Sequence, residues 1–267
     1  MRRSLLGEVV LWLLVVIAAA VLLRGYMAKE DNFQETEIIA TEPEGTENKT
    51  VAAFAKANGL QYSQYPQSLV ELLERNPETV DFVLEYPQEY GKDHDVDMDM
   101  YADSDAVPLF LQWDQRWGYI DYGDDVAGIT GCGPVCLSMA AYYVTEDEAM
   151  SPDRIIRFAL DNGYYEPGIG SAWTLISEGG ELLGLDVTEI PLDEERIFSN
   201  LEVDNPIICA MGPGDFTSSG HFIVMVGCED GLIRINDPNS IQNSQKLWEY
   251  AQIKDQIENL WVIREGW

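Results

Sequence analysis

One cysteine lies where a thiol can become a nucleophile. Cys132 belongs to the run Gly131-Cys132-Gly133-Pro134, which leads directly into an apolar segment. Proline suits the first turn of a helix, because the N–H that it lacks would be unpaired there. Cys132 would then lie at the positive end of a helix dipole, beside backbone N–H groups that lower a thiol pKa and can bind an oxyanion. The flanking glycines favour exposure, so we predict a nucleophile and not a buried core cysteine.

A histidine and an aspartate follow at positions that a hairpin would bring together. His221 opens an apolar strand after a glycine-bearing loop, and Asp237 ends the next strand, after a Glu-Asp-Gly turn. A hairpin places the start of one strand beside the end of the next. The carboxylate would fix the imidazole tautomer and stabilise the imidazolium while the ring deprotonates Cys132. The other histidine, His94, lies in an acidic connector and is a poor candidate for the base.

The remaining cysteines and acidic residues give no sign of a metal or cofactor. Four cysteines and two histidines leave little material for a zinc site. Nothing in the spacing of Cys132, Cys136, Cys209 and Cys228 fixes a pairing, so we expect free thiols. The aspartates between residues 93 and 105 lack the glycine turn and the downstream glutamate of a calcium loop. We therefore expect neither a cofactor nor a metal ion.

The elements that must position these residues indicate an α+β fold. Helical patterns come first and strand patterns later, which is typical of an antiparallel sheet with segregated helices. Predicted helices cover residues 51–58, 66–75, 77–86, 132–144, 152–163, 171–183 and 193–200, with Ser171 as a cap and Pro87 as a stop. Predicted strands cover residues 107–112, 185–190, 206–211, 221–226, 232–235 and 260–263.

The chain divides by composition into four segments. Residues 1–28 read as a membrane anchor or signal segment, 29–50 as a flexible acidic stalk, 51–106 as a helical extension with an acidic connector, and 107–267 as the main domain. Residues 51–90 are too few to bury their own core, so we expect them to pack on the domain that follows.

The first segment supports two interpretations. Arg2 and Arg3 precede a charge-free apolar run over residues 9–23, which spans only about 22 Å as a helix against a hydrocarbon core of about 30 Å. Extending the run back to Leu5 gives a full span. A cleaved signal peptide is the alternative, but a small-residue cleavage site is poor here. We expect an uncleaved anchor with the body on the extracytoplasmic side.

The charge of the chain excludes one class of partner. The chain has 267 residues, with 47 acidic and 16 basic side chains, and a formal net charge of -31. Such a surface repels phosphate backbones, so nucleic-acid binding is not expected. The sequence leaves the oligomeric state open.

The order and spacing of five short motifs resemble those of a peptidase family. The motifs are Val107-Pro108 through Gln112, Gln115-Arg116-Trp117-Gly118, Gly131-Cys132-Gly133-Pro134, Gly220-His221-Phe222-Ile223-Val224 and Asn236-Asp237-Pro238. Together they are similar to the peptidase family thirty-nine-like group of bacterial surface cysteine peptidases, which are related to the bacteriocin double-glycine leader peptidases.

The resemblance implies a papain-like fold and assigns roles to residues. Cys132 would be the nucleophile, on the N-terminus of a central helix packed against an antiparallel sheet that carries the base His221 and the orienting acid Asp237. It also implies a glutamine in the oxyanion hole, for which Gln112 fits best and Gln115 is the alternative.

The predicted function is hydrolysis of a peptide or amide bond by a membrane-tethered or secreted extracytoplasmic cysteine peptidase. The reaction would pass through a thioester acyl-enzyme on a peptide or protein substrate, which could include cell-wall peptide. The loops at residues 166–171 and 212–220 and the tryptophans would wall the cleft. Two alternatives remain open: a non-enzymatic surface binding module on the same scaffold, and a cell-wall peptide amidase.

Overall fold

The computed structural model describes residues 47–102 and 104–266. The described residues from Asn48 onward belong to one compact unit. Within the described ranges, no helix combines the length and the apolar content that crossing a bilayer requires. The anchor predicted at residues 1–28 lies outside the described part of the chain, and so does the predicted stalk up to residue 46.

Helices dominate the first half of the described chain, and the strands of an antiparallel sheet dominate its second half. The helices are α2 (Lys49–Ala57), α3 (Gln67–Arg75), α4 (Val80–Glu89), α5 (Ala127–Thr130), α6 (Cys132–Thr145), α7 (Pro152–Asp161), α8 (Gly180–Leu182), α9 (Glu194–Leu201), α10 (Ile241–Ser244) and α11 (Tyr250–Ile253). The strands are β1 (Asp121–Tyr122), β2 (Asp125–Val126), β3 (Tyr165–Glu166), β4 (Gly170–Ser171), β5 (Leu185–Glu189), β6 (Ile207–Met211), β7 (His221–Glu229), β8 (Leu232–Asn236), β9 (Leu247–Trp248) and β10 (Ile257–Glu265).

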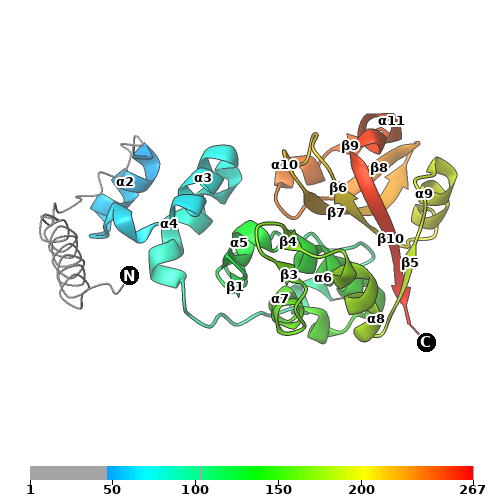
Figure 1. The fold of residues 1–267 in the computed structure, drawn as a ribbon, viewed down its shortest axis with the longest axis horizontal. Coiled ribbons are helices and arrows are strands. Elements are labelled where there is room, and N and C mark those ends of the chain that lie inside the picture. The colour runs from blue at the N-terminus through cyan, green and yellow to red at the C-terminus, as the bar shows by residue number, and fades with distance from the viewer. Residues whose placement is uncertain (1–46, 103, 267) are drawn as a thin grey trace, which may run out of the picture. The chain divides into compact units, whose positions relative to one another are not determined.

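Six of the strands form one fully antiparallel sheet in the order β5-β10-β6-β7-β8-β9. Figure 1 shows this sheet in yellow to red, with the green helices α5 to α8 gathered on one side of it. The hairpin between β7 and β8 closes through Asp230 and Gly231, both at positive φ (51° and 77°). Two such residues in succession form the turn that matches strand twist, as the Glu-Asp-Gly sequence predicted.

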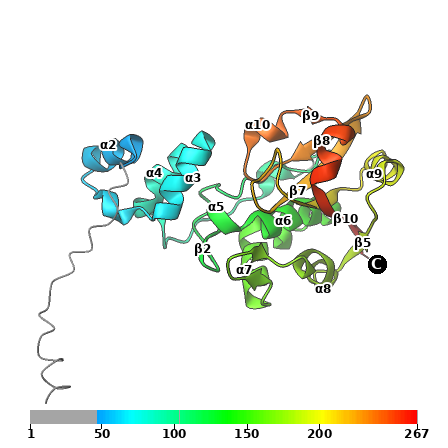
Figure 2. The same cartoon turned by 45° about the horizontal axis from the view of Figure 1, so that its top comes forward.

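Successive side chains of a strand point to opposite faces of the sheet, and in the central strands both sets are apolar, so the sheet has two apolar faces. One face packs on α6 with side chains that include Ile208, Ala210, Phe222, Val224 and Trp261. The other face packs on α9 with the alternate residues, including Ile207, Cys209, Ile223, Met225 and Val262. Both faces are covered, so β6, β7 and β10 read in the sequence as continuous apolar runs. Figure 2 shows α6 and α9 on different sides of these strands. The predicted α+β class is confirmed, with the central helix packed against the antiparallel sheet.

The segment before the main domain, residues 48–102, is called the helical extension here. Its helices α2, α3 and α4 form where the sequence predicted them, and their apolar sides share a core with Tyr119 and Val126 of the following segment. Phe82 stacks on Tyr119 with ring centroids 4.5 Å apart. The extension therefore completes its core against the rest of the unit, as its small size required.

Three local predictions are wrong. Residues 107–112 form no strand, because Pro108 lacks an N–H and the segment is held by the side chain of Asn236, whose Nδ2 donates to the carbonyls of Val107 and Pro108, both at 3.1 Å. Ser171 does not cap a helix, since it belongs to β4 and pairs with Tyr165. Helix α4 runs past Pro87 to Glu89, so proline lies in its last turn instead of stopping it.

Candidate active site

Cys132 is the first residue of α6, at the end of an almost completely buried helix. Gly131 precedes it as the cap, and the carbonyl of Gly131 accepts the N–H of Val135 at 3.1 Å. Residues 133–142 are all buried, whereas Cys132 is partly exposed. The sequence pattern of a turn, a proline and an apolar run thus builds a rigid helix whose first side chain reaches the surface.

The start of α6 lies tightly against β4. A Cβ placed on Gly133 would come within 2.5 Å of both Cβ and Oγ of Ser171, so the close approach requires glycine there. The hydroxyl groups of Ser171 and Tyr122 are hydrogen-bonded at 2.8 Å. The packing of Ser171 against Gly133 places the end of the loop at residues 166–171 beside the start of α6, next to Cys132.

His221 and Asp237 meet through the hairpin. His221 is the first residue of β7, and Asp237 directly follows Asn236, the last residue of β8, which pairs with Val224. His221 Nε2 lies 2.8 Å from Asp237 Oδ1. The side chains are 8% and 1% exposed, so the pair is shielded from water and its electrostatic interaction is little screened.

Asp237 is held by groups that the sequence analysis did not identify. Its Oδ1 also accepts the backbone N–H of Asn239 at 2.9 Å, and its Oδ2 accepts Nδ2 of Asn243 at 2.8 Å. Ser244 Oγ accepts the N–H of Asp237 at 2.9 Å. Asn243 and Ser244 come from α10, a short helix after the Asp-Pro turn, and no motif in the sequence marked it.

The electrostatics of the site favour a charged thiolate–imidazolium pair. Burial raises the pKa of Cys132, but the hydrogen bond and charge of His221, with the N–H groups of Phe222 and Gly133, outweigh it and lower the pKa below its usual value. Burial lowers the pKa of His221, but the charge and hydrogen bond of Asp237, with a further contribution from Cys132, raise it to about 10. The structure thus brings Cys132, His221 and Asp237 into one connected chain.

Gln112 links the segment after Asp237 to the segment before Cys132, and it lies outside a strand. Its backbone N–H donates to the carbonyl of Pro238 at 2.7 Å, and its Nε2 donates to the carbonyls of Gly128 at 3.0 Å and Ile129 at 3.2 Å. The side chain is buried, and its Oε1 has no partner among the described residues. The alternative, Gln115, donates from Nε2 to Glu85 at 2.7 Å and so binds the helical extension instead.

The other three cysteines differ from Cys132. All four are free thiols. Burial raises the pKa of Cys136 and of Cys209, both in the core. Burial and the charges of Glu202 and Asp204 also raise the pKa of the partly exposed Cys228. Among the four, only Cys132 combines access to solvent with a lowered thiol pKa.

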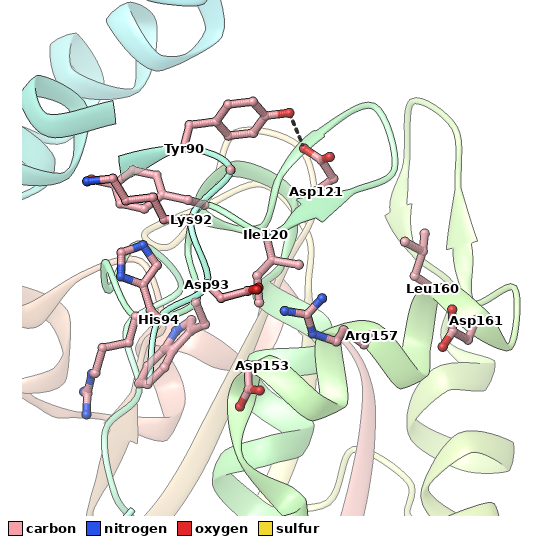
Figure 3. Close-up of a pocket in the computed structure, with 14 residues that line it drawn as sticks. Tyr90, Lys92, Asp93, His94, Ile120, Asp121, Asp153, Arg157, Leu160 and Asp161 are labelled. Carbon is pink, nitrogen blue, oxygen red and sulfur yellow. Dashed lines mark hydrogen bonds between the residues drawn. The ribbon is translucent and has the colours of Figure 1, made fainter. Parts of the chain in front are cut away.

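A separate cleft of about 480 Å³ lies between the end of α4 and α7. Figure 3 shows its labelled side chains, among them Lys92, His94, Asp153 and Arg157, and the hydrogen bond between Tyr90 and Asp121 at 2.9 Å. No residue of the Cys-His-Asp chain lines this cleft.

Within residues 47–102 and 104–266, no group of three or more His, Cys, Asp or Glu side chains is placed to hold a metal ion.

Comparison with known proteins gives a family and distant structural relatives. The model of the Peptidase_C39 like family matches residues 104–266. No curated protein matches the chain. Among solved structures, the peptidase domain of Streptococcus ComA, a bi-functional ABC transporter involved in a quorum sensing pathway, is 17% identical, with 60% of this chain and 99% of that chain covered and a TM-score of 0.43. A C39-like peptidase from Bacillus anthracis is 14% identical, with 60% and 96% covered and a TM-score of 0.37.

Proposed function

The chain belongs to the Peptidase_C39 like family, and on that premise we propose that it is a cysteine peptidase whose reaction runs through Cys132, His221 and Asp237. One observation carries the proposal: the partly exposed thiol at the start of α6 is hydrogen-bonded to the His221 ring, which in turn binds a buried carboxylate whose two oxygens both accept hydrogen bonds. The substrate class is a peptide or protein with an accessible amide bond.

The first step is attack by the Cys132 thiolate on the carbonyl carbon. The ring of His221 holds the thiol proton before substrate arrives, since its raised pKa and the lowered pKa of Cys132 favour the charged pair. A C–S bond forms, and the electron pair of the carbonyl moves onto its oxygen. Because His221 Nε2 is bound to Asp237, the Nδ1 edge is the one that faces the sulfur.

The developing oxyanion needs hydrogen-bond donors close to the sulfur. The first N–H groups of α6 have no carbonyl partners within the helix, and we propose that the N–H of Cys132 is one donor. For the second we propose the Nε2 of Gln112, which is buried next to the segment before the nucleophile. Gly128 and Ile129 already accept from this nitrogen, so stabilising an oxyanion would require the amide to share or turn its hydrogens.

Collapse of the tetrahedral intermediate breaks the C–N bond. The proton held by His221 passes to the leaving amine nitrogen, which departs as a neutral amine. Water then attacks the thioester, gives its proton to His221 and releases the carboxylic acid, and the C–S bond breaks to restore the thiolate. Asp237 keeps its charge throughout and stabilises the imidazolium whenever it forms.

The proposed location is the extracytoplasmic side of a membrane, held there by residues 1–28. Support comes only from the sequence, in which Arg2 and Arg3 precede the apolar run at residues 9–23. Fractionation of cells with protease added outside tests this: the full-length chain is expected in the membrane fraction and accessible to the protease. Recovery of an intact chain that is inaccessible from outside would contradict the proposal.

Incubation with a library of unstructured peptides tests the peptidase activity. Wild type is expected to release new amino termini, while Cys132→Ala and His221→Ala release none above background, and Cys228→Ala, a thiol outside the site, behaves as wild type. A parallel digestion of cell-wall muropeptides separates the amidase alternative. Absence of cleavage in both, with a thiol at Cys132 of ordinary reactivity, would leave a binding module.

A further inference from the structure

The loop that holds Asp237 is itself held by residues outside the family-matched segment. The carboxylate of Glu78 accepts two consecutive backbone N–H groups at the start of α10, those of Ile241 at 2.8 Å and Gln242 at 2.9 Å. Glu78 lies in the short turn between α3 and α4 (Pro77–Thr79), in the helical extension. The contact joins residues 163 and 164 positions apart.

A second contact from the same turn reaches the same loop. Asn76 Nδ2 donates to the carbonyl of Asn239 at 2.6 Å, and Trp113 Nε1 donates to the same carbonyl at 3.2 Å. Asn76 Oδ1 meanwhile accepts the N–H of Glu78 at 3.0 Å, which fixes the geometry of the turn. The extension thus contacts the loop at Asn239 and again at Ile241 and Gln242.

These contacts lie at and between the two residues that position the carboxylate of Asp237, Asn239 and Asn243. The N–H of Asn239 binds Oδ1 and the side chain of Asn243 binds Oδ2. A helix of four residues is unstable by itself, so α10 needs external contacts to hold Asn243 in place. Glu78 supplies a charge-assisted pair of such contacts, which are stronger and shorter than neutral hydrogen bonds.

Glu78 has no competing role in the described structure. Within residues 47–102 and 104–266, no basic side chain forms an ion pair with Glu78. The chain has 47 acidic side chains and only 16 basic ones to pair with them. Its partly buried carboxylate therefore binds the backbone of α10 and no charged side chain among the described residues. In the unfolded chain water would bind this carboxylate instead, so the two hydrogen bonds add little net stability. Their main effect is to fix the position of the loop.

We propose that Glu78 and Asn76 are positioning residues of the reaction, which hold the loop at residues 237–244 so that Asp237 meets His221. This inference rests on the proposed function, because it assigns these residues to the same reaction. The helical extension is then a required support of the active site, and its release would slow the enzyme instead of activating it.

The test compares Glu78→Ala and Glu78→Gln with Glu71→Gln in the full chain. Glu71 lies on α3, is exposed and contacts only Gln67 among its described hydrogen-bond partners, so its change removes the same charge without touching the loop. The readouts are the rate of Cys132 alkylation by iodoacetamide against pH, the kcat and KM for a cleaved peptide, and the thermal unfolding midpoint.

Glu78→Ala is expected to lower kcat and the alkylation rate at pH 6 by about tenfold, since misplacing a catalytic group by about 1 Å can cost up to a hundredfold. KM changes little, and Glu78→Gln, which keeps one acceptor oxygen, falls between Glu78→Ala and Glu71→Gln. A role limited to stability would lower the unfolding midpoint and leave the alkylation profile of the folded protein unmoved.

Equal alkylation profiles and equal kcat in folded Glu78→Ala and Glu71→Gln would overturn the inference. If Glu78→Ala does not fold, the same comparison with Glu78→Gln decides, and Asn76→Ala gives an independent second variant. The alkylation readout does not depend on turnover. A wild type that cleaves no peptide would therefore contradict the proposed function. Slower alkylation of Cys132 in Glu78→Ala would still show that Glu78 positions the Asp237 loop.

Discussion

Asp237 Oδ1 lies 2.8 Å from His221 Nε2, one residue past the last paired position of the β7–β8 hairpin. The ladder ends at Asn236, and the next residue turns its carboxylate back toward the first residue of β7. The contact occupies one ring nitrogen and leaves the other for Cys132. The hairpin register therefore determines both the orientation of the imidazole and the nitrogen that meets the thiol.

Iodoacetamide is expected to alkylate Cys132 first among the four cysteines. At pH 6 its rate should exceed that of Cys228 by at least about tenfold, because the pKa of Cys132 is lowered and that of Cys228 is raised, and each pKa unit changes the thiolate fraction about tenfold. Mass spectrometry of tryptic peptides measures both rates in one sample. In His221→Ala only burial and the backbone N–H groups remain, so the advantage of Cys132 should disappear. Equal rates for Cys132 and Cys228 in wild type would contradict the assignment.

The pH dependence of kcat/KM is expected to be bell-shaped. Activity requires thiolate with imidazolium, so it rises as pH passes the lowered pKa of Cys132 and falls as pH passes the raised pKa of His221, which is about 10. The two limbs belong to the pair, because the groups are coupled. Initial rates measured from pH 4 to 11 give the curve. A profile that begins to rise only near pH 9, where an ordinary thiol ionises, would show that the pair does not form.

Replacing Asp237 is expected to separate orientation from charge. Asp237→Ala loses both and should lower kcat by about 10²- to 10⁴-fold. In Asp237→Asn the amide oxygen can still accept from His221 Nε2, so the loss should be smaller. Without the carboxylate charge the pKa of His221 falls, which moves the basic limb of the profile to lower pH. The kcat and the basic limb are measured for both variants. An unmoved basic limb in Asp237→Asn would show that Asp237 does not set the charge of the ring.

Gln112→Ala is expected to lower kcat by about 10²-fold with little change in KM, if its amide stabilises the oxyanion. The matched control is Gln115→Ala, whose amide binds Glu85 and not the site, and which should keep its kcat. Since Gln112 also binds the carbonyls of Gly128 and Ile129, urea unfolding is measured alongside. A variant that loses stability but keeps kcat when folded would assign Gln112 to structure alone.

Gly133→Ala is expected to destabilise the protein by about 1–3 kcal/mol, because the new Cβ overlaps Ser171. Removing the opposing side chain with Ser171→Gly should relieve the overlap. In that background, Gly133→Ala should be neutral or stabilising, since alanine is favoured over glycine in a helix by about 1 kcal/mol. A double-mutant cycle by urea denaturation measures the coupling. Additive effects of the two changes would mean that the start of α6 and β4 are not in contact.

The residues of the site that were predicted from the sequence lie where local patterns change. Cys132 follows a glycine turn before a proline, His221 follows a glycine loop before an apolar strand, and Asp237 precedes a proline at the end of a strand. Each pattern marks an element boundary by short-range sterics, so each residue could be placed from its neighbours alone.

What the sequence did not reveal lies in a helix too short to show a pattern and in one long-range contact. Asn243 binds Asp237, six positions away, from a four-residue helix without a pattern of its own. Glu78 reaches α10 across 163 residues. Ser171 resembled a helix cap, but it pairs in β4 and bonds Tyr122. A hydroxyl cap and a strand residue share the same local signal, and packing against Gly133 selects between them.

The hydrogen bonds around Asp237 also bear on the order in which this protein matures. Asn236 binds Val107 across 129 residues, and Glu78 binds Ile241 across 163, so neither contact can form before the segment at residues 236–241 has been synthesised. Contacts this distant in sequence form slowly, whereas the local helix α6 forms early. In a nascent chain, His221 would therefore not lower the pKa of Cys132 until β7 and β8 have been synthesised and have packed on α6. The lowered pKa of this thiol is then a property of the folded molecule and not of the segment that carries Cys132.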